Sequence, residues 1–449
     1  MSDRRKIMEL FEKNKALIDE RVKLGIEKYR KGNAKIRLVD ESGSPIKNVK
    51  IKFSQKSHEF KFGANLFMLD ELETEEKNES YKKHFSELFN IATLPFYWNT
   101  SEPEKGKPRY KRDSEKIYRR PAIDLCMEFC EENGIEPREH ALAYEHFFPD
   151  WLADKSTDEE KSELERRYSE ISTRYKDKIP TIEVTNEMDW GKGKTAFYDS
   201  SEYVYWCFKT AEKYFPDNTL CINEDTNSAW GGCIRATDRY YSYIEANLLK
   251  GARIDAIGMQ YHMFFQREKE YEATRKFLDP IRLYKTMDLY SEFGKPLQIT
   301  EITIPSYSWE EEDETIQAEI IEYLYSIWFS HPNVSQIIYW NLVDGYAHVW
   351  ENDPVKIKRT QGDMTVGENY YHGGLLRFDL TPKPAYNKIK ELIKERWHTE
   401  EELITDEDGY VSFRGFFGEY ELLIGDGEEQ KAKSLTLFSK GNNDKTIIV

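Results

Sequence analysis

Between residues 62 and 340 the sequence repeats one pattern eight times: a short apolar run is followed by a longer stretch with helical periodicity. The runs lie at residues 62–66, 91–94, 137–144, 181–186, 220–223, 256–261, 297–302 and 336–340. Eight strand–helix repeats predict an α/β protein whose core is a (β/α)8 TIM barrel with enlarged loops. A doubly wound open sheet is the alternative, but neither GxGxxG nor GxxxxGKS/T follows an early run.

The two ends of the chain follow other patterns. Residues 1–31 carry one apolar stripe of helical period, which predicts an amphipathic N-terminal helix. Residues 32–62 and 400–449 alternate like short strands around Gly/Pro turns. Because an isolated hairpin is only marginally stable, we predict that these two segments pack together as one small β-sandwich module. The catalytic barrel is then expected over residues 63–399.

Charge and hydropathy limit the possible partners. The chain has 65 basic and 82 acidic residues, a net charge of −17, whereas binding a phosphate backbone needs a basic face. No apolar run approaches the ~18 residues of a membrane span. We therefore expect neither a nucleic-acid partner nor a membrane partner. The nine histidines include no HExxH motif and no close His/Cys pair, so we expect no metal and no cofactor.

The N-terminus and the cysteines bear on the compartment. The first 25 residues are charged throughout and contain no apolar signal-peptide core. Five cysteines are an odd number and fit reduced thiols better than a disulfide framework; Cys126 and Cys130, four residues apart, are expected on a buried helix face. We expect a cytoplasmic protein, with a secreted one that lacks its signal peptide as the alternative.

Polar side chains gather where the apolar runs end, and in a barrel those ends form the active site. The candidates are His140 and Glu145 at the third run, Asn186 and Glu187 at the fourth, Gln260 and His262 at the sixth, Glu301 at the seventh and Trp340 at the eighth. Since polar groups are costly to bury unpaired, we expect them to face one shared cleft.

Two carboxylates on opposite sides of a barrel mouth suit cleavage of a glycosidic bond. One carboxyl group holds a proton for the leaving oxygen, while the other stays ionised to attack the anomeric carbon. If Glu187 and Glu301 lie about 5–5.5 Å apart, the mechanism is retaining. The alternative for either residue is a solvated loop acid among the 82 acidic residues.

Several segments around these residues resemble glycoside hydrolase family 10, the retaining endo-β-1,4-xylanase family. They are TNE at 185–187, IGMQYH at 257–262, ITEITI at 299–304 and PKPAY at 382–386. Weaker matches in the same order are HALAYEHFFPDW at 140–151, INEDTN at 222–227 and YWNLVDGY at 339–346. The resemblance covers roughly residues 60–396.

The resemblance implies a role for most of the candidate residues, in a mechanism that needs no metal. Glu187 becomes the acid/base and Glu301 the nucleophile of a two-step displacement on a β-linked carbohydrate. Asn186 is implied to hydrogen-bond the 2-hydroxyl of the sugar being cleaved, and His262, with Gln260 beside it, to orient Glu301. His140 and Trp340 are implied to line the subsite in which the glycosyl intermediate forms.

Other positions depart from the family pattern. Leu94 and Tyr97 stand where the family usually has Asn and Lys, Tyr144 and Glu145 replace a Trp-His pair, Thr303 replaces an Asp, and His348 replaces a Trp. Such changes alter polar contacts to sugar hydroxyls, so the substrate is less certain than the reaction class. Tyr97 and Glu145 remain candidates for substrate binding.

Tryptophans that follow barrel strands are candidates for stacking on sugar rings, with core packing as the alternative for each. They are Trp98, Trp151, Trp190, Trp340 and Trp350. The acidic run at residues 310–314 is expected to be a solvated helix start.

Three functions stay open at this point. The first is a retaining hydrolase that cleaves β-1,4-xylosidic bonds in xylan-derived oligosaccharides. The second is a hydrolase of the same clan that acts on a different β-linked sugar. The third is a non-catalytic glycan-binding descendant, against which the presence of both Glu187 and Glu301 counts.

Overall fold

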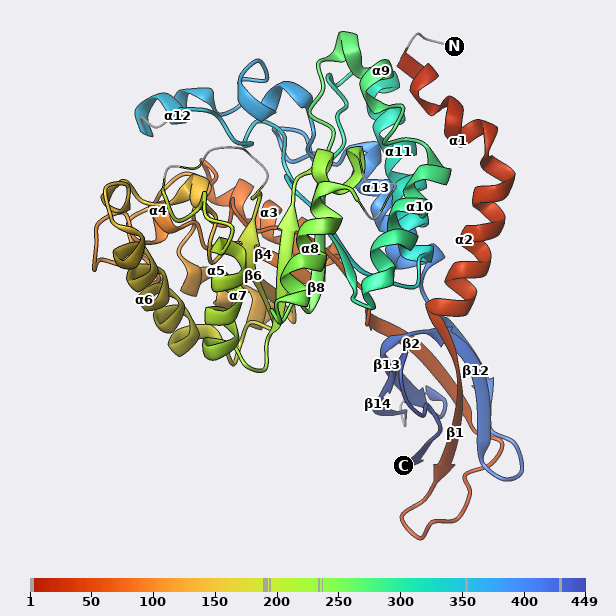
Figure 1. Ribbon diagram of the computed structural model, residues 1–449. Helices are drawn as coiled ribbons and strands as arrows, with labels where there is room; N and C mark the ends of the chain where they lie inside the picture. Colours follow the sequence, from red (N-terminus) through yellow and green to blue (C-terminus); the bar gives the residue numbers. More distant parts are fainter. Residues whose placement is uncertain are drawn as a thin grey trace.

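A closed barrel of eight parallel strands forms the body of the protein (Figure 1). The computed structural model describes residues 4–188, 193, 195–232, 235, 237–351, 354–427 and 430–449. The barrel strands are β3 (Lys61–Asn65), β4 (Ile91–Pro95), β5 (Glu136–His140), β6 (Thr181–Asn186), β7 (Thr219–Glu224), β8 (Ala256–His262), β9 (Leu297–Thr303) and β10 (Val334–Tyr339). Each strand pairs with the next along the chain, and β10 closes onto β3. The barrel prediction is confirmed, and the open-sheet alternative is wrong.

Helices connect the strands and surround the barrel. They are α3 (Glu75–Leu88), α4 (Trp98–Ser101), α5 (Ile123–Asn133), α6 (Thr157–Tyr175), α7 (Tyr203–Tyr214), α8 (Arg239–Leu249), α9 (Glu270–Thr274), α10 (Pro280–Tyr290), α11 (Glu311–Ser330), α12 (Pro354–Thr360) and α13 (Pro384–Glu391). Short 3-10 or π helices are η2 (Glu145–Phe147), η3 (Asp150–Leu152), η4 (Asn227–Gly231), η5 (Arg267–Lys269), η6 (Ser291–Phe293), η7 (Gly367–Tyr371) and η8 (Leu392–Arg396).

Each of the eight apolar runs overlaps a barrel strand, but the third strand ends earlier than predicted. Strand β5 ends at His140 rather than at residue 144. Beyond His140 the backbone follows β6 through single hydrogen bonds, from the amide of Leu142 to the carbonyl of Glu183 (2.9 Å) and from the amide of Ala143 to that of Val184 (3.1 Å). The polar segment after His140 therefore turns out of the regular ladder into the barrel mouth.

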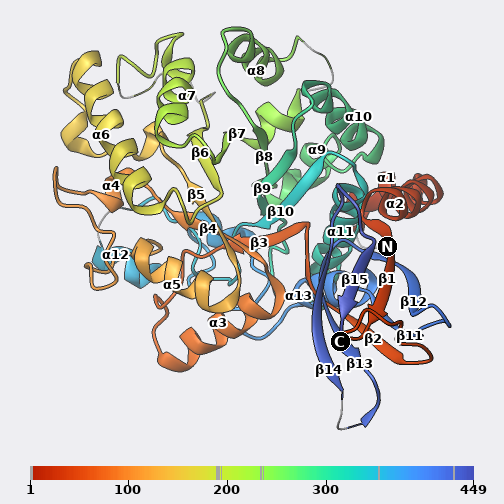
Figure 2. The same cartoon turned by 90° about the horizontal axis from the view of Figure 1, so that it is seen from below.

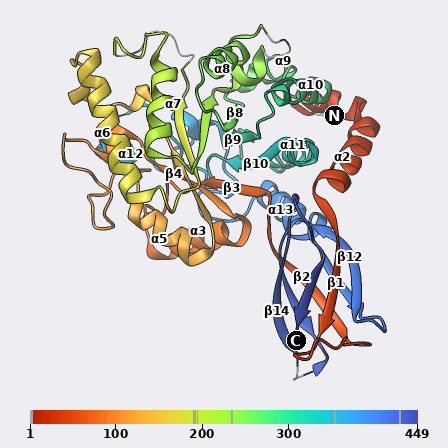
Figure 3. The ribbon, with the colours of Figure 1, turned by 60° about the horizontal axis from the view of Figure 1, so that its bottom comes forward.

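Strands from both chain ends form two further sheets that pack face to face (Figure 3). One sheet has the order β12 (Tyr410–Phe416), β1 (Lys31–Val39), β15 (Lys445–Ile448); the other has the order β11 (Glu400–Ile404), β2 (Lys50–His58), β13 (Gly418–Ile424), β14 (Lys431–Leu437). Ile36, Phe53 and Leu422 belong to the apolar cluster between them. This sandwich confirms the second part of the fold prediction.

The sandwich meets the barrel at the end where the barrel strands begin. Strand β2 ends at His58, three residues before β3 starts, so the two sheets follow each other directly in the chain. Arg30 reinforces this junction by donating to the carbonyls of Phe329 (2.5 Å) and Val334 (2.7 Å), just before and at the start of β10. Figure 2 shows the sandwich strands beside α11 and α13. The opposite end of the barrel is left for the candidate site.

The N-terminal segment is helical but not one helix. It divides into η1 (Arg4–Met8), α1 (Glu9–Lys13) and α2 (Lys15–Tyr29), with a break at Asn14, whose side chain donates to the carbonyl of Leu10. Its apolar stripe packs on α11, where the ring of Phe11 stacks on that of Tyr323 at 4.7 Å between centroids. The stripe is therefore covered within the chain.

The cysteines in the described part of the chain are buried free thiols. Cys126 and Cys130 are buried on α5, as expected, and Cys207 and Cys221 are also free thiols. Cys233 lies outside the described residues. Among the residues that the structure describes, no helix has the length and apolar character required to cross a bilayer.

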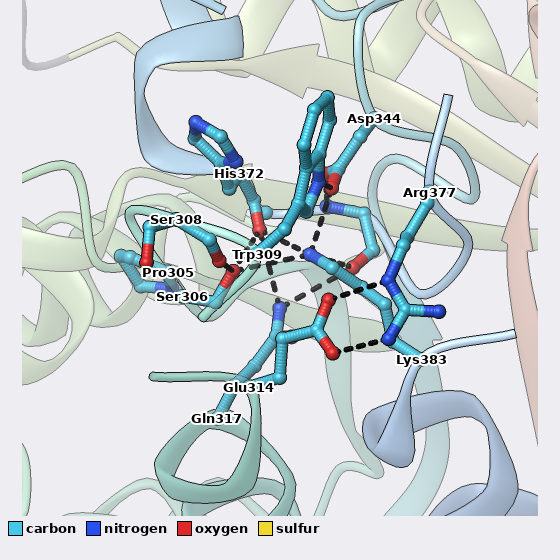
Figure 4. Close-up of polar contacts among 12 residues, drawn as sticks. Pro305, Ser306, Ser308, Trp309, Glu314, Gln317, Asp344, His372, Arg377 and Lys383 are labelled. Carbon is cyan, nitrogen blue, oxygen red and sulfur yellow. Dashed lines mark hydrogen bonds and ion pairs between the residues drawn. The ribbon is translucent and has the colours of Figure 1, made fainter. Parts of the chain in front are cut away.

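A buried polar network fastens the loops that follow β9 and β10 (Figure 4). The ammonium group of Lys383 is fully buried, pairs with Asp344 at 2.8 Å, and donates to the hydroxyl of Ser306 (3.1 Å) and to the carbonyl of His372 (2.7 Å). The indole of Trp309 donates to the same carboxylate at 2.8 Å. One lysine thus joins three loop segments behind the barrel mouth.

The acidic run at residues 310–314 is partly buried, whereas the sequence predicts a solvated helix start. Helix α11 does start there, at Glu311, but Glu314 is buried rather than solvated. Its carboxylate accepts two hydrogen bonds from the guanidinium of Arg377, next to Lys383 (Figure 4). The ion pair compensates the cost of burying this carboxylate.

We expect Lys383→Met to lower the free energy of unfolding by about 3–5 kcal/mol, because it leaves the buried carboxylate of Asp344 without its cation. Urea unfolding followed by circular dichroism measures the change. The matched control is Lys107→Met, whose lysine pairs with Glu104 on the surface and is 72% exposed; it should change stability by less than about 0.5 kcal/mol. Equal effects of the two substitutions would contradict a stabilising role for the buried pair.

Candidate active site

A cleft of about 630 Å³ opens where the barrel strands end. Nine of the residues predicted from the sequence line it, namely Tyr97, His140, Glu145, Glu187, Gln260, His262, Glu301, Trp340 and Trp350. Asn186 is buried next to the cleft, Trp98 and Trp151 pack against each other outside its lining, and Trp190 lies outside the described residues. The expectation of one shared cleft is therefore met by side chains from six of the eight strands or the loops that follow them.

Glu187 leaves strand β6 through a left-handed backbone conformation. Its φ is 52°, a region that non-glycine residues rarely adopt, and its amide donates to the carbonyl of Asn223 at 3.2 Å. Its carboxylate accepts hydrogen bonds from the amide of Gln260 (2.8 Å) and from the hydroxyl of Tyr144. Burial, followed by the charge of Glu301, raises the pKa of Glu187 to about 7. This carboxyl group is suited to hold a proton near neutral pH.

Glu301 lies within strand β9 and is only 3% exposed. One carboxylate oxygen accepts from the side-chain amide of Asn223 at 3.0 Å, and the other lies 3.2 Å from Nε2 of His262. Burial and the charge of Glu183 raise the pKa of Glu301, to about 7, against the opposing effect of His140. Two donors thus hold this carboxylate in a fixed orientation.

His262 is oriented by Thr303, one of the positions that depart from the family pattern. Nδ1 of His262 lies 2.9 Å from the hydroxyl of Thr303, and burial lowers the pKa of His262 to about 4. In the neutral ring, Nδ1 accepts a hydrogen bond from the hydroxyl of Thr303, and the Nε2–H group donates a hydrogen bond to Glu301. The ionised carboxylate of Glu301 can only accept, so it selects this tautomer, and the hydroxyl of Thr303 satisfies the other ring nitrogen.

Three amide side chains connect the two glutamates. Asn186 accepts from the amides of Asn223 (2.9 Å) and Gln260 (3.2 Å), which in turn donate to Glu301 and Glu187. The amide nitrogen of Asn186 is buried and has no hydrogen-bond partner among the described residues. A buried donor of this kind is normally satisfied, so a bound ligand is the natural partner for it.

A buried charge cluster below the site was missed in the sequence. Glu183 pairs with the guanidinium of Arg138, and its other oxygen lies 2.8 Å from Nδ1 of His140. Burial alone would raise the pKa of Glu183, but the charges of Arg138 and His140 hold it below its usual value. Only Glu183 gave a signal, since it stands between Ile182 and Val184, whereas Arg138 lies among other charged residues of β5.

Only one group of residues in the described chain brings metal-ligating atoms together, and it belongs to this cluster. Ligand atoms of His140, Glu183 and Glu301 lie within 4.8 Å of one another. The guanidinium of Arg138 already supplies the positive charge to Glu183.

The aromatic candidates divide between the cleft and the core. Trp340 is 6% exposed and lies near the ring of His262 (5.8 Å between centroids), while Trp350 is 75% exposed at the rim. Trp98 is buried against Trp151 and donates to Glu102 (2.9 Å), so its prediction as a substrate-binding residue is wrong. Its apolar neighbours and an internal acceptor explain this placement. Trp190 lies outside the described residues.

The other departures from the family pattern also have definite positions. Tyr97 fills the cleft where the family has a lysine and contacts Nε2 of His140 at 3.0 Å, whereas Leu94 is buried in the barrel. Glu145 is 6% exposed and accepts from the amide of Thr195 (3.1 Å), so it is not a solvated loop acid. His348 lines the cleft, and burial together with nearby arginines lowers its pKa to about 3.

Comparison with known protein families gives one match across most of the chain. A family model described as Glycosyl hydrolase family 10 matches residues 56–392. Anti-sigma-I factor RsgI6 of Acetivibrio thermocellus is 25% identical over 403 residues, which cover 89% of this chain and 45% of that protein. Endo-1,4-beta-xylanase 2 of Arabidopsis thaliana is 24% identical over 426 residues, which cover 94% of this chain and 35% of that protein. The chain thus spans less than half the length of these relatives.

Solved structures support the fold. Xylanase 10B from Thermotoga petrophila RKU-1, in complex with xylobiose, aligns with a TM-score of 0.57 at 22% identity and covers 75% of this chain and 95% of its own. Native xylanase 10B from Thermotoga maritima aligns with the same TM-score and identity and covers 96% of its own chain. The aligned part corresponds in extent to the barrel rather than to the whole chain.

We expect Tyr144→Phe to move the alkaline limb of the kcat/KM profile to higher pH. The Tyr144 hydroxyl donates to Glu187 and favours its charged form, so removing the hydroxyl raises the pKa of Glu187 further and keeps it protonated at higher pH. Tyr214→Phe, which removes a tyrosine hydrogen bond to Glu165 far from the cleft, should leave the profile unchanged. A shift to lower pH in Tyr144→Phe would contradict this description of the site.

Proposed function

The chain belongs to glycosyl hydrolase family 10, and on this premise we propose that it hydrolyses β-1,4-xylosidic bonds in xylan-derived oligosaccharides with retention of configuration. The observation that carries the proposal is the pair of carboxyl groups, Glu187 and Glu301, that line one cleft from two barrel strands. Each accepts two side-chain hydrogen bonds, and the amides of Asn186, Asn223 and Gln260 connect them.

Glu187 acts in this proposal as the general acid and then as the general base. Burial and the charge of Glu301 raise its pKa to about 7, so about half of the Glu187 carboxyl groups carry a proton at pH 7. That proton passes to the leaving oxygen as the glycosidic bond breaks. When Glu301 becomes esterified, its negative charge disappears and the pKa of Glu187 falls. Glu187 can then take a proton from the attacking water.

Glu301 acts as the nucleophile that attacks the anomeric carbon. The amide of Asn223 and the neutral ring of His262 fix the two oxygens of its carboxylate, so the attacking lone pair is directed before substrate arrives. The free amide of Asn186, next to Glu187 in the chain, is positioned to donate to a sugar hydroxyl. A hydrogen bond of this type that strengthens as charge develops lowers the barrier.

The choice of substrate is inferred from the names of similar proteins and from the residues that line the cleft. Endo-1,4-beta-xylanase 2 and both xylanase 10B proteins are called xylanases, and one of the two solved structures contains xylobiose. Tyr97 and His348 change the cleft lining relative to the family pattern, which favours an altered sugar preference as the second candidate. A non-catalytic glycan-binding protein is disfavoured, because both glutamates and the donors that orient them are present.

We expect Glu301→Ala to lower kcat on 4-nitrophenyl β-xylobioside by about 10³-fold or more, because no other group can form the glycosyl intermediate. Thermal unfolding by circular dichroism checks that the variant folds. The matched control is Glu104→Ala, whose glutamate is 69% exposed on the surface and should not affect turnover. NMR of the first product should show the β-anomer.

Assays of the wild-type protein on several sugars determine which substrate it prefers. Aryl β-xylobioside, β-glucoside and β-arabinoside are compared at equal concentration with xylo-oligosaccharides. Preference for β-xylobioside supports the proposed substrate, and preference for another sugar supports the second candidate. A lack of turnover on every substrate, or full activity of Glu301→Ala, would contradict a Glu301-dependent hydrolase.

We expect Glu187→Ala to separate substrates by their leaving groups. A dinitrophenolate leaves without protonation, so the first step on a dinitrophenyl β-xylobioside should be nearly unchanged. A xylo-oligosaccharide needs the proton, and its hydrolysis should slow by about 10²–10⁴-fold. Pre-steady-state kinetics measures both steps. Equal losses on the two substrates would assign Glu187 a role other than proton transfer.

A further inference from the structure

Two consecutive arginines, Arg119 and Arg120, line the catalytic cleft. They are 3% and 7% exposed, respectively, and come from the segment between α4 and α5. In the part of the chain that the structure describes, neither guanidinium forms an ion pair with a carboxylate. The chain as a whole has a net charge of −17, so two unpaired cations in its main cleft are unusual. Burying such a charge is costly unless a partner compensates it.

The contacts of the two side chains fix them in place without neutralising them. Arg119 donates to the side-chain oxygen of Asn341 (2.8 Å) and to the carbonyl of Tyr346 (2.6 Å), while its Nε is buried with no partner among the described residues. Arg120 donates to the carbonyl of Arg119 (2.9 Å). Its guanidinium carbon lies 3.8 Å from the centre of the Tyr97 ring. The cations are therefore held by neutral partners.

The surroundings of the pair have the electrostatic character of an anion site. Burial lowers the pKa of Arg120 to about 10, and burial together with both arginines lowers the pKa of His348 to about 3. Glu368 also lines the cleft, but its carboxylate accepts from the amide of Asn341 (3.3 Å) rather than from an arginine. An incoming anion would therefore meet two guanidinium groups that no carboxylate pairs with directly, although the charge of Glu368 lies nearby.

The pair lies close to the reacting atoms. Tyr97, on which Arg120 stacks, contacts Nε2 of His140 at 3.0 Å, and Nδ1 of His140 lies 3.9 Å from a carboxylate oxygen of Glu301. Two side chains thus separate Arg120 from the proposed nucleophile. A sugar unit bound to Glu301 would have its substituents, or the next unit of its chain, within reach of Arg120. The aromatic rings of Tyr97 and Phe147 flank this position and suit the apolar face of a pyranose.

We propose that Arg120, supported by Arg119, forms a subsite for the carboxylate of a uronic acid unit in the oligosaccharide substrate. The proposal rests on the proposed hydrolase function and specifies its substrate class. A guanidinium binds a carboxylate through two parallel hydrogen bonds, a geometry that a neutral sugar cannot supply. The uronic acid is either a branch on a neutral chain or a unit of the chain itself, because both carry the same carboxylated pyranose.

The test compares kcat/KM for acidic and neutral substrates of equal length. One acidic substrate is a β-1,4-xylo-oligosaccharide with a glucuronic acid branch, the other has a glucuronic acid unit within the chain, and the neutral reference is the unsubstituted xylo-oligosaccharide. Charge-assisted hydrogen bonds predict an acidic-to-neutral ratio of at least about tenfold for one acidic substrate. The substrate that shows this preference identifies the source of the carboxylate.

The variant Arg120→Gln should reduce that ratio to near one. Its matched control is Arg112→Gln, the same change eight residues earlier, at a side chain that is 68% exposed and pairs with Glu128. This control should keep the wild-type ratio. If Arg120→Gln does not fold, inhibition of the wild-type protein replaces it, and D-glucuronate should inhibit at least about tenfold more strongly than D-glucose.

The outcomes separate this proposal from the proposed function. If the neutral substrate is hydrolysed and neither acidic substrate is preferred, or if the two monosaccharides inhibit equally, the carboxylate subsite is wrong and the hydrolase assignment stands. An acidic preference that persists in Arg120→Gln also overturns the subsite. If the wild-type protein hydrolyses no substrate of the set, both proposals fail together.

Discussion

Three carboxyl groups share the carboxyl end of one barrel, and the arrangement of the site follows from how their charge is compensated. Glu183 is neutralised by Arg138 and His140, whereas Glu187 and Glu301 are held by neutral donors and burial raises the pKa of each to about 7. Like charges close together in a buried site cannot all stay ionised. Glu187 and Glu301, both held by neutral donors only, therefore do not readily ionise together, and the proposed mechanism places the proton on Glu187.

The rest of the fold keeps this arrangement rigid. Lys383 and Asp344 tie the loops behind β9 and β10 together, and the adjacent pair of Glu314 and Arg377 closes the same network. The sandwich and the N-terminal segment pack against the outside of the barrel and at the end where its strands begin. The sandwich thus supports the barrel at the end opposite the site, whereas the Lys383–Asp344 network fastens the loops at the site's own end.

Much of the fold and the central pair of the site could be predicted from the sequence. Eight apolar runs specify eight strands because the periodicity is local, and Glu187 and Glu301 follow since strand ends meet at one mouth. Trp98 could not be placed, because whether an aromatic ring faces the cleft or the core depends on contacts with distant residues such as Trp151. Arg120 was missed for a related reason, since its loop carries no periodic pattern and its stacking on Tyr97 is a tertiary contact.

The central claim is that Glu301 forms the covalent intermediate. A 2-deoxy-2-fluoro-β-xylobioside with a dinitrophenolate leaving group slows both chemical steps while the good leaving group still allows the first, so the intermediate accumulates. Peptide mass spectrometry then locates the added sugar. We expect the label on the peptide that contains Glu301. A label on Glu187 or Glu183, or continued hydrolysis of xylobiosides without any label, would contradict it.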